Sequence, residues 1–136
     1  MYEPVYSIEY SALYFTTGPI SSESSFGGEC HVFVCGALQD PLAMSALLGL
    51  EPPFAPAVAS GYRRTVERVG GKDVSFMAPD EHDPRSVLTG VVWLDLSRAS
   101  LEKIESLELD GGIRKRIAIE ARIGELKLTA YTYIKK

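Results

Sequence analysis

The feature that most constrains the fold of this chain is an uninterrupted apolar run, Val32-Phe33-Val34, which stops shortly before a glycine, Gly36. A strand with one face in solvent alternates apolar and polar residues, and this run does not alternate. We therefore expect a strand over residues 31–35 that is covered on both of its faces. The first strand of the domain should lie inside the fold.

A capped helix is expected soon after this strand. Asp40 can act as its N-cap with Pro41 in the first helical position, and residues 42–48 carry the helix to Gly49. Gly36 lies at the preceding break, where a residue without a side chain lets the backbone approach a ligand closely. Free amides of a loop and a helix start attract anions, which suits a carboxylate or a phosphate. An ordinary strand-to-helix connection explains the same residues, so both interpretations stay open.

Composition bounds the class of protein. The chain has 136 residues, 46% of them hydrophobic, which suffices for one domain with a proper core. A net charge of −4 and a pI near 5.2 argue against nucleic acid or an anionic membrane as partner, although Arg114-Lys115-Arg116 forms one basic cluster. No stretch approaches the roughly 20 apolar residues of a membrane span, and the N-terminus lacks the layout of a signal peptide. We expect a cytoplasmic protein.

The cysteines and histidines indicate neither a disulfide nor a metal site. Cys30 and Cys35 are an odd number of residues apart on one predicted strand, so their side chains should point to opposite faces. Together with His31 and His82 they do not have the spacing of a structural zinc site. His82 lies in a polar loop and is expected to be solvated. Cys35 is either a catalytic thiol or a small buried hydrophobic residue, and we favour the second.

Residues 1–29 differ from the rest of the chain and are assigned to an N-terminal extension, which leaves a domain over residues 30–136. Residues 18–28 are rich in Ser and Gly and are typical of a linker. Before them, tyrosines alternate with polar residues as in a strand, although a spacing of four also fits a helical stripe; they are Tyr2, Tyr6, Tyr10 and Tyr14. Such an aromatic face would pack on the domain or on a second copy of the chain, and in the second case the protein would be a homodimer.

The rest of the domain predicts five further strands and a second helix. The strands are expected over 57–69, 73–77, 86–96, 113–121 and 126–134, and the helix from its N-cap at Ser97 to about Glu108. The order is β-α-β-β-β-α-β-β. Short loops between neighbouring strands predict an α+β fold, in which a mostly antiparallel sheet curls toward a small barrel flanked by two helices.

The second helix carries the residue with the clearest catalytic potential. Leu101, Ile104 and Leu107 define its expected buried stripe. Glu108 lies about 40° from the centre of that stripe and Glu105 about 100° from it, at 100° per residue. Glu108 is also at the carboxyl end of the helix, where the dipole disfavours negative charge. Burial and dipole should both raise its pKa, which suits a general acid or base.

A second interpretation of Glu108 is equally open at this point. If the helix ends one residue earlier, the side chain of Glu108 turns to solvent. It would then form an ion pair with Arg114 or Arg116.

Several segments, taken together and in order, resemble the γ-glutamylcyclotransferase-like family, which includes the γ-glutamylamine cyclotransferases. They are VFVCGALQDPLAMSALLG, PAVASGYRRTV, VLTGVVWLDLS, LEKIESLELDGGIRKRI and AYTYI. The resemblance covers the chain from about His31 to its C-terminus and leaves the first 29 residues unexplained. It implies a small mixed barrel with flanking helices, in agreement with the order of elements predicted above.

The resemblance also implies the site residues. Cys35-Gly36-Ala37-Leu38 stands where the family has Tyr-Gly-x-Leu, a loop whose backbone binds the carboxylate of a γ-glutamyl group. Glu108 stands at the position of the family's catalytic glutamate. Tyr133, in the last of the similar segments, is implied as a further substrate-binding residue.

The implied reaction is an intramolecular cyclisation that needs no metal and no organic cofactor. The α-amine of a γ-glutamyl amino acid or γ-glutamylamine attacks its own γ-carbonyl, which releases 5-oxoproline and an amine. Two residues depart from the family pattern, since Cys35 replaces a tyrosine and Leu109 replaces the glycine after the glutamate. The alternative function is therefore a catalytically inactive module of the same fold that binds a small carboxylate or another protein.

Overall fold

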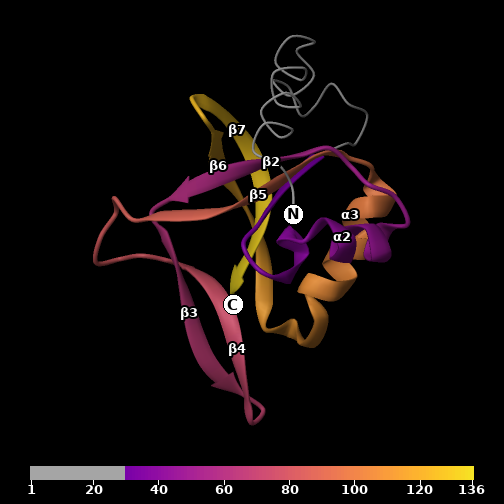
Figure 1. Ribbon diagram of the computed structural model, residues 1–136. Helices are drawn as coiled ribbons and strands as arrows, with labels where there is room; N and C mark the ends of the chain where they lie inside the picture. The colour runs from indigo at the N-terminus through magenta and orange to yellow at the C-terminus, as the bar shows by residue number, and fades with distance from the viewer. Residues whose placement is uncertain (1–29) are drawn as a thin grey trace.

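The computed structural model describes residues 30–136, and its centre is a closed barrel of five strands (Figure 1). Around the barrel the strands follow the order β1-β5-β2-β6-β7, with the bounds β1 Cys30–Val34, β2 Phe54–Ser60, β5 Val87–Leu96, β6 Arg114–Ile123 and β7 Leu126–Lys135. Neighbouring strands are antiparallel except β1 and β7, which are parallel. The predicted mixed barrel is confirmed.

Two helices and two short turns accompany the barrel. Helix α2 spans Pro41–Leu48 and helix α3 spans Arg98–Glu108, while the 3₁₀ turns η3 and η4 span Ala37–Gln39 and Asp110–Gly112. Both helices lie beside each other on one side of the barrel (Figure 1). Their predicted caps are present, because Asp40 accepts from the amide of Leu42 at 3.0 Å and Ser97 accepts from that of Ser100 at 3.1 Å.

One predicted strand is wrong, since the segment 57–69 forms two strands that belong to different sheets. β2 ends at Ser60, and β3 (Tyr62–Val69) pairs only with β4 (Lys72–Pro79). Gly61 separates them with a φ of 84°, a conformation that favours glycine, and its amide donates to the carbonyl of Ser86 at 2.7 Å. The β-forming sequence continues through this turn, so the local pattern conceals it.

β2 also begins earlier than predicted. It starts at Phe54 instead of residue 57 and contains Pro56. Pro56 is tolerated there because β2 pairs with β5 along its length, whereas on its other edge it pairs with β6 only at Val58.

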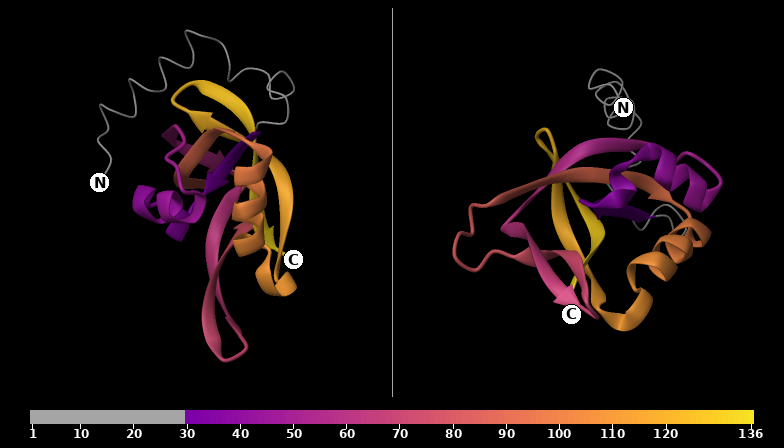
Figure 2. Two further views of the ribbon diagram at one scale, coloured as in Figure 1. Left: turned by 90° about the vertical axis from the view of Figure 1, so that its right-hand side faces the viewer. Right: turned by 60° about the horizontal axis from the view of Figure 1, so that its bottom comes forward.

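The β3–β4 hairpin projects away from the barrel, as the left view of Figure 2 shows. Only Phe76 and Met77 of the hairpin are fully buried, and they lie on β4. The rest of the hairpin is half-buried or exposed. The barrel therefore carries the core, and the hairpin is an arm attached to it by one end of β4.

The first strand separates two apolar cores. Phe33 points into the barrel, while Val32 and Val34 point toward the helices, where they join Met44, Trp93 and Ile104. All five residues of β1 are buried, so the predicted cover on both faces is confirmed. The Trp93 indole donates to the carbonyl of Leu38 at 3.0 Å, which fixes the segment after β1 to the barrel.

Two sequence expectations concern membranes and the N-terminus. Among residues 30–136, none of the helices has the length and apolar character that a membrane span requires. The tyrosine pattern and the Ser/Gly segment lie in residues 1–29, outside the described residues.

Candidate active site

A pocket of about 470 Å³ lies where the end of β1, the end of α3 and the β3–β4 hairpin meet. Figure 2 shows the end of α3 and the hairpin together on one side of the barrel. The pocket is lined by residues 33–38, by Arg64 and residues 73–77 of the hairpin, by Leu107, Glu108 and Arg114, and by Thr132 and Tyr133. It thus joins the two regions that the sequence analysis singled out, the loop after β1 and the end of the second helix.

Glu108 is the last residue of α3, and its carboxylate contributes to the pocket wall. The side chain is only 24% exposed, and this burial raises its pKa. The guanidinium of Arg114 opposes that effect from 4.0 Å, between its Nε and Glu108 Oε1. Each of the two interpretations of Glu108 from the sequence is therefore partly right. Glu108 lies beside Arg114, one of its two predicted partners, and it also lines a pocket.

The predicted buried stripe of this helix is partly wrong. Ile104 is fully buried, but Leu107 is 51% exposed, and the carboxylate of Glu105 turns inward instead. The cause is polar and long-range, since Glu105 accepts hydrogen bonds from Arg116 on β6 and Tyr133 on β7, each at 2.9 Å. These partners turn the helix so that both Glu105 and Glu108 face the barrel.

The loop after β1 presents mainly backbone to the pocket. Gly36 and Ala37 are exposed while the Leu38 side chain is buried, and all three line the pocket. A Cβ atom on Gly36 would meet no other atom within 4 Å, so the space beside this glycine is open to a ligand. The first amides of a helical turn have no acceptor within that turn, which leaves those of Gly36–Leu38 suited to an anion.

Cys35 lines the pocket as a neutral thiol. Burial raises its pKa, and this effect exceeds the opposing influence of Arg64 and Arg114. A reactive cysteine needs the opposite shift, because its thiolate is the nucleophile. The environment therefore favours the interpretation of Cys35 as a small packing residue. Cys30 and Cys35 are both free.

Tyr133 brings an aromatic wall to the pocket from β7, and its side chain is buried. Its hydroxyl donates to Glu105 Oε2, and burial together with that hydrogen bond raises its pKa. Arg116 completes the arrangement by stacking over Tyr131, 4.4 Å from the ring centre. Glu105 was not among the predicted site residues, although it holds one of them in place.

The hairpin supplies pocket residues that sequence reasoning missed, and Arg114 of β6 contacts two of them. Arg114 donates to the carbonyl of Ser75 at 2.6 Å and lies 4.8 Å from the ring centre of Phe76. Arg64 donates to Ser75 Oγ at 3.2 Å. No local motif marks these residues, because the contacts join segments that are far apart in the chain. His82 lies away from the pocket and is exposed, as expected.

The assembled groups can move a proton and hold anions. A carboxylate of raised pKa, a loop rich in accessible amides and two arginines surround one small cavity. Within residues 30–136, no three His, Cys, Asp or Glu side chains gather as a metal site. A carboxylate of raised pKa beside free backbone amides is an arrangement that could support acid–base chemistry.

This barrel has the fold of the γ-glutamylcyclotransferase-like proteins, and the resemblance inferred from the sequence motifs is confirmed. None of the known family models matches the sequence. A structure described as a γ-glutamyl cyclotransferase aligns with a TM-score of 0.66 at 13% identity, over 79% of this chain and 67% of that one.

Two plant proteins are also similar. Protein AIG2 B of Arabidopsis thaliana is 26% identical over 114 residues, which cover 84% of this chain. The aligned region spans 63% of the length of that curated relative. The solution structure of another Arabidopsis thaliana protein aligns with a TM-score of 0.65 at 24% identity, over 79% of this chain and 68% of that one.

Proposed function

We propose that this chain is a γ-glutamyl cyclotransferase-type enzyme that releases 5-oxoproline from a γ-glutamyl amino acid or a γ-glutamylamine. The observation that carries the proposal is Glu108, a carboxylate of raised pKa at the end of a helix, facing a pocket whose other wall is the loop after β1. The fold shared with a γ-glutamyl cyclotransferase supports the same assignment.

In the proposed mechanism Glu108 acts as the base and then as the acid. The substrate α-ammonium first gives a proton to the carboxylate, because a protonated amine cannot attack. The freed nitrogen attacks the γ-carbonyl carbon and forms the C–N bond of the ring. The amide C–N bond then breaks while Glu108 returns its proton to the leaving nitrogen. Once the ring has closed, its nitrogen gives a second proton to the Glu108 carboxylate, and Glu108 passes that proton to the released amine. Both protons lost by the attacking nitrogen thus end on the leaving amine, and Glu108 is regenerated as a carboxylate.

The loop at Gly36–Leu38 would orient the substrate. Its amides would bind the α-carboxylate and place the α-nitrogen near the γ-carbon, and such orientation supplies much of the rate of a tethered reaction. The open space beside Gly36 leaves room for that carboxylate. Tyr133 and Cys35 would shape the remaining wall, with no charge of their own.

Two departures from the family pattern are compatible with this mechanism. Leu109 ends α3 with an ordinary backbone conformation, and the positive φ that a glycine tolerates occurs two residues later at Gly111. Glu108 therefore keeps its place without a following glycine. Cys35 is smaller than the tyrosine it replaces, and it lines the pocket beside the loop.

The proposal is tested by 5-oxoproline release from γ-glutamyl amino acids and γ-glutamylamines. Glu108→Gln keeps the shape of the side chain but cannot exchange the proton, so we expect kcat to fall by roughly 10²- to 10⁴-fold. Glu102→Gln, an exposed position on the same helix, is the matched control and should leave kcat unchanged. Turnover retained in Glu108→Gln would remove Glu108 from the mechanism.

The alternative is a carboxylate-binding module without turnover. Arg114 beside Glu108 favours it, because a nearby cation stabilises the charged form of the carboxylate and weakens it as a base. Calorimetry with γ-glutamylalanine separates the two functions. Binding without 5-oxoproline release from any substrate of the panel would support the module.

A further inference from the structure

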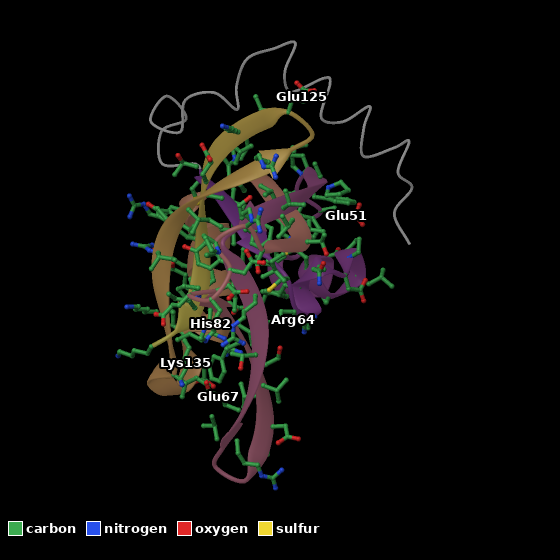
Figure 3. All side chains as sticks on the ribbon, turned by 90° about the vertical axis from the view of Figure 1, so that its left-hand side faces the viewer. Glu51, Arg64, Glu67, His82, Glu125 and Lys135 are labelled. Carbon is green, nitrogen blue, oxygen red and sulfur yellow. The ribbon has the colours of Figure 1, made fainter. Side chains whose placement is uncertain are left out.

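Arg64 is a pocket residue that the proposed mechanism does not use. It lies on β3 next to the rim of the pocket and is exposed, unlike the buried residues Tyr133 and Thr132 at the inner wall. In Figure 3 it lies on the side of the hairpin toward the η3–α2 segment, whereas Glu67 and Lys135 lie on the side toward β7. The guanidinium is thus placed where a ligand would meet solvent.

The register of the hairpin fixes this orientation. Arg64 is opposite Met77 and Val66 is opposite Ser75, so Arg64, Ser75 and Met77 share one face of the two-stranded sheet. Met77 is buried against the barrel, and Ser75 Oγ accepts a hydrogen bond from Arg64 at 3.2 Å. All three residues line the pocket, and the hydrogen bond to Ser75 holds the arginine at the pocket wall.

The charges around the pocket leave Arg64 available for an anion. Within residues 30–136, no carboxylate lies within 4 Å of its guanidinium, whereas Arg68 pairs with Asp73 at 3.0 Å and Arg116 with Glu105 at 2.9 Å. Arg114 approaches Glu108 at 4.0 Å and shares Ser75 with Arg64. Two guanidinium groups thus converge on Ser75, while the pocket carries two carboxylates, Glu108 and Asp73, of which Asp73 is paired with Arg68.

We propose that Arg64 is a specificity-determining residue that binds a carboxylate on the leaving group of the substrate. This inference rests on the proposed function and refines its substrate class. The α-carboxylate of the glutamyl moiety would occupy the loop at Gly36–Leu38, with the γ-carbonyl near Glu108. The leaving group would then extend toward the hairpin wall of the pocket, where Arg64 can form a charge-assisted pair with the carboxylate of a leaving amino acid. A leaving amine without a carboxylate would gain nothing from it.

The test compares two substrates that differ only in this carboxylate, γ-glutamylalanine and γ-glutamylethylamide. For the unchanged protein, kcat/KM should be higher with γ-glutamylalanine. Arg64→Gln should lower kcat/KM for γ-glutamylalanine by roughly 10- to 100-fold, the range of a lost charged hydrogen bond, and leave γ-glutamylethylamide nearly unchanged. Arg64→Lys should restore part of the preference, because it keeps the charge but not the planar fork.

Arg63→Gln is the matched control. Arg63 neighbours Arg64, is exposed and points to the other face of β3, so its loss removes the same charge from the hairpin without touching the pocket. It should keep the preference for γ-glutamylalanine. A loss of that preference in Arg63→Gln as large as in Arg64→Gln would assign the effect to net charge and overturn the proposal.

The outcomes also separate this inference from the proposed function. Equal kcat/KM for both substrates, or a preference that survives Arg64→Gln, overturns the role of Arg64 while the cyclotransferase activity stands. If neither substrate is turned over, the proposed function fails, and calorimetric binding of the same two compounds decides about Arg64. Tighter binding of γ-glutamylalanine that disappears in Arg64→Gln supports the anion site, and equal binding overturns it.

Discussion

The β-barrel and the β3–β4 hairpin both border the pocket, but they differ in how deeply their residues are buried. In β5, Val91 to Leu94 are at most 1% exposed, and their side chains fill the two cores on either side of the strand. In β3, by contrast, no residue is fully buried, and Val66 is 65% exposed. The barrel is held by packing on every side, and the hairpin is held at one end.

From this difference we expect the barrel to determine the stability of the protein and the hairpin to influence which substrate it uses. The residues proposed to perform the reaction lie on the barrel or on helix α3 packed beside it, where neighbours fix their positions. The residue proposed to select the substrate lies on the arm. Changes in the arm should therefore alter which substrate is used at little cost in folding, while changes in the barrel should cost stability first.

The expectation that changes in the barrel cost stability is tested most strongly by Gly90→Ala. A Cβ atom at Gly90 would lie 2.3 Å from the carbonyl oxygen of Val34 and 2.7 Å from the Phe33 ring, so β1 must shift away from β5. We expect the free energy of unfolding to fall by about 3 kcal/mol, the upper part of the range for overpacking. Urea unfolding followed by circular dichroism measures it.

Gly36→Ala is the steric control for that variant. The added methyl group meets no protein atom within 4 Å, so stability should change by less than about 0.5 kcal/mol, as for substitutions away from packed features. The same methyl group would enter the space assigned to the substrate carboxylate and should raise KM. Similar losses of stability in both glycine variants would contradict the close approach of β1 to Gly90.

The polar link between the barrel and α3 is tested by Tyr133→Phe. This change removes the hydrogen bond to Glu105 and leaves the ion pair of Glu105 with Arg116 in place. We expect a loss of roughly 1 kcal/mol, the usual net value of one hydrogen bond. In a double-mutant cycle with Glu105→Ala, which removes the acceptor, the two losses should not add, because both variants break the same contact. Strict additivity would show that the hydrogen bond contributes nothing to the position of Tyr133.

The sequence predicted the barrel better than the arm because different information determines each. The helix caps and the buried run at Val32–Val34 are local, and the structure reproduces them. β2 ends at Ser60 because the residues after it pair in a different sheet. A continuous β-forming sequence does not show where the chain passes from one sheet to the other. Arg64 and Ser75 could not be placed at the pocket for the same reason.

The helix α3 shows a second limit of sequence reasoning. The apolar stripe correctly predicts that Ile104 is buried and that Glu108 faces inward. It fails at Leu107 and Glu105, because it assumes that apolar residues alone choose the buried side. Here Arg116 and Tyr133 lie on two strands that follow later in the chain. Their hydrogen bonds to Glu105 hold that carboxylate on the inner side of the helix.

The burial of Glu108 predicts a dependence of stability on pH. Its pKa is raised in the folded state, so in the window between the unfolded and folded values the folded chain binds more protons than the unfolded chain. This carboxyl therefore contributes its full stability below the unfolded pKa and loses it as pH rises through the folded pKa. The difference in unfolding free energy between Glu108→Gln and the unchanged protein should grow in favour of the variant from pH 4.5 to pH 7.5. A constant difference would show that Arg114 fully compensates the burial.

The smallest effect is expected at the ion pair between the hairpin and the barrel. Lys135 Nζ lies 2.7 Å from Glu67 Oε2, but both side chains are more than a third exposed, so solvent screens their attraction. Glu67→Gln should lower the unfolding free energy by no more than about 0.5 kcal/mol, and 1 M salt should erase the difference. Glu125→Gln, in the β6–β7 turn far from the hairpin in Figure 3, is the matched control. A loss well above 1 kcal/mol in Glu67→Gln alone would mean that the arm is held by this charge pair, and not by the buried side chains of Phe76 and Met77.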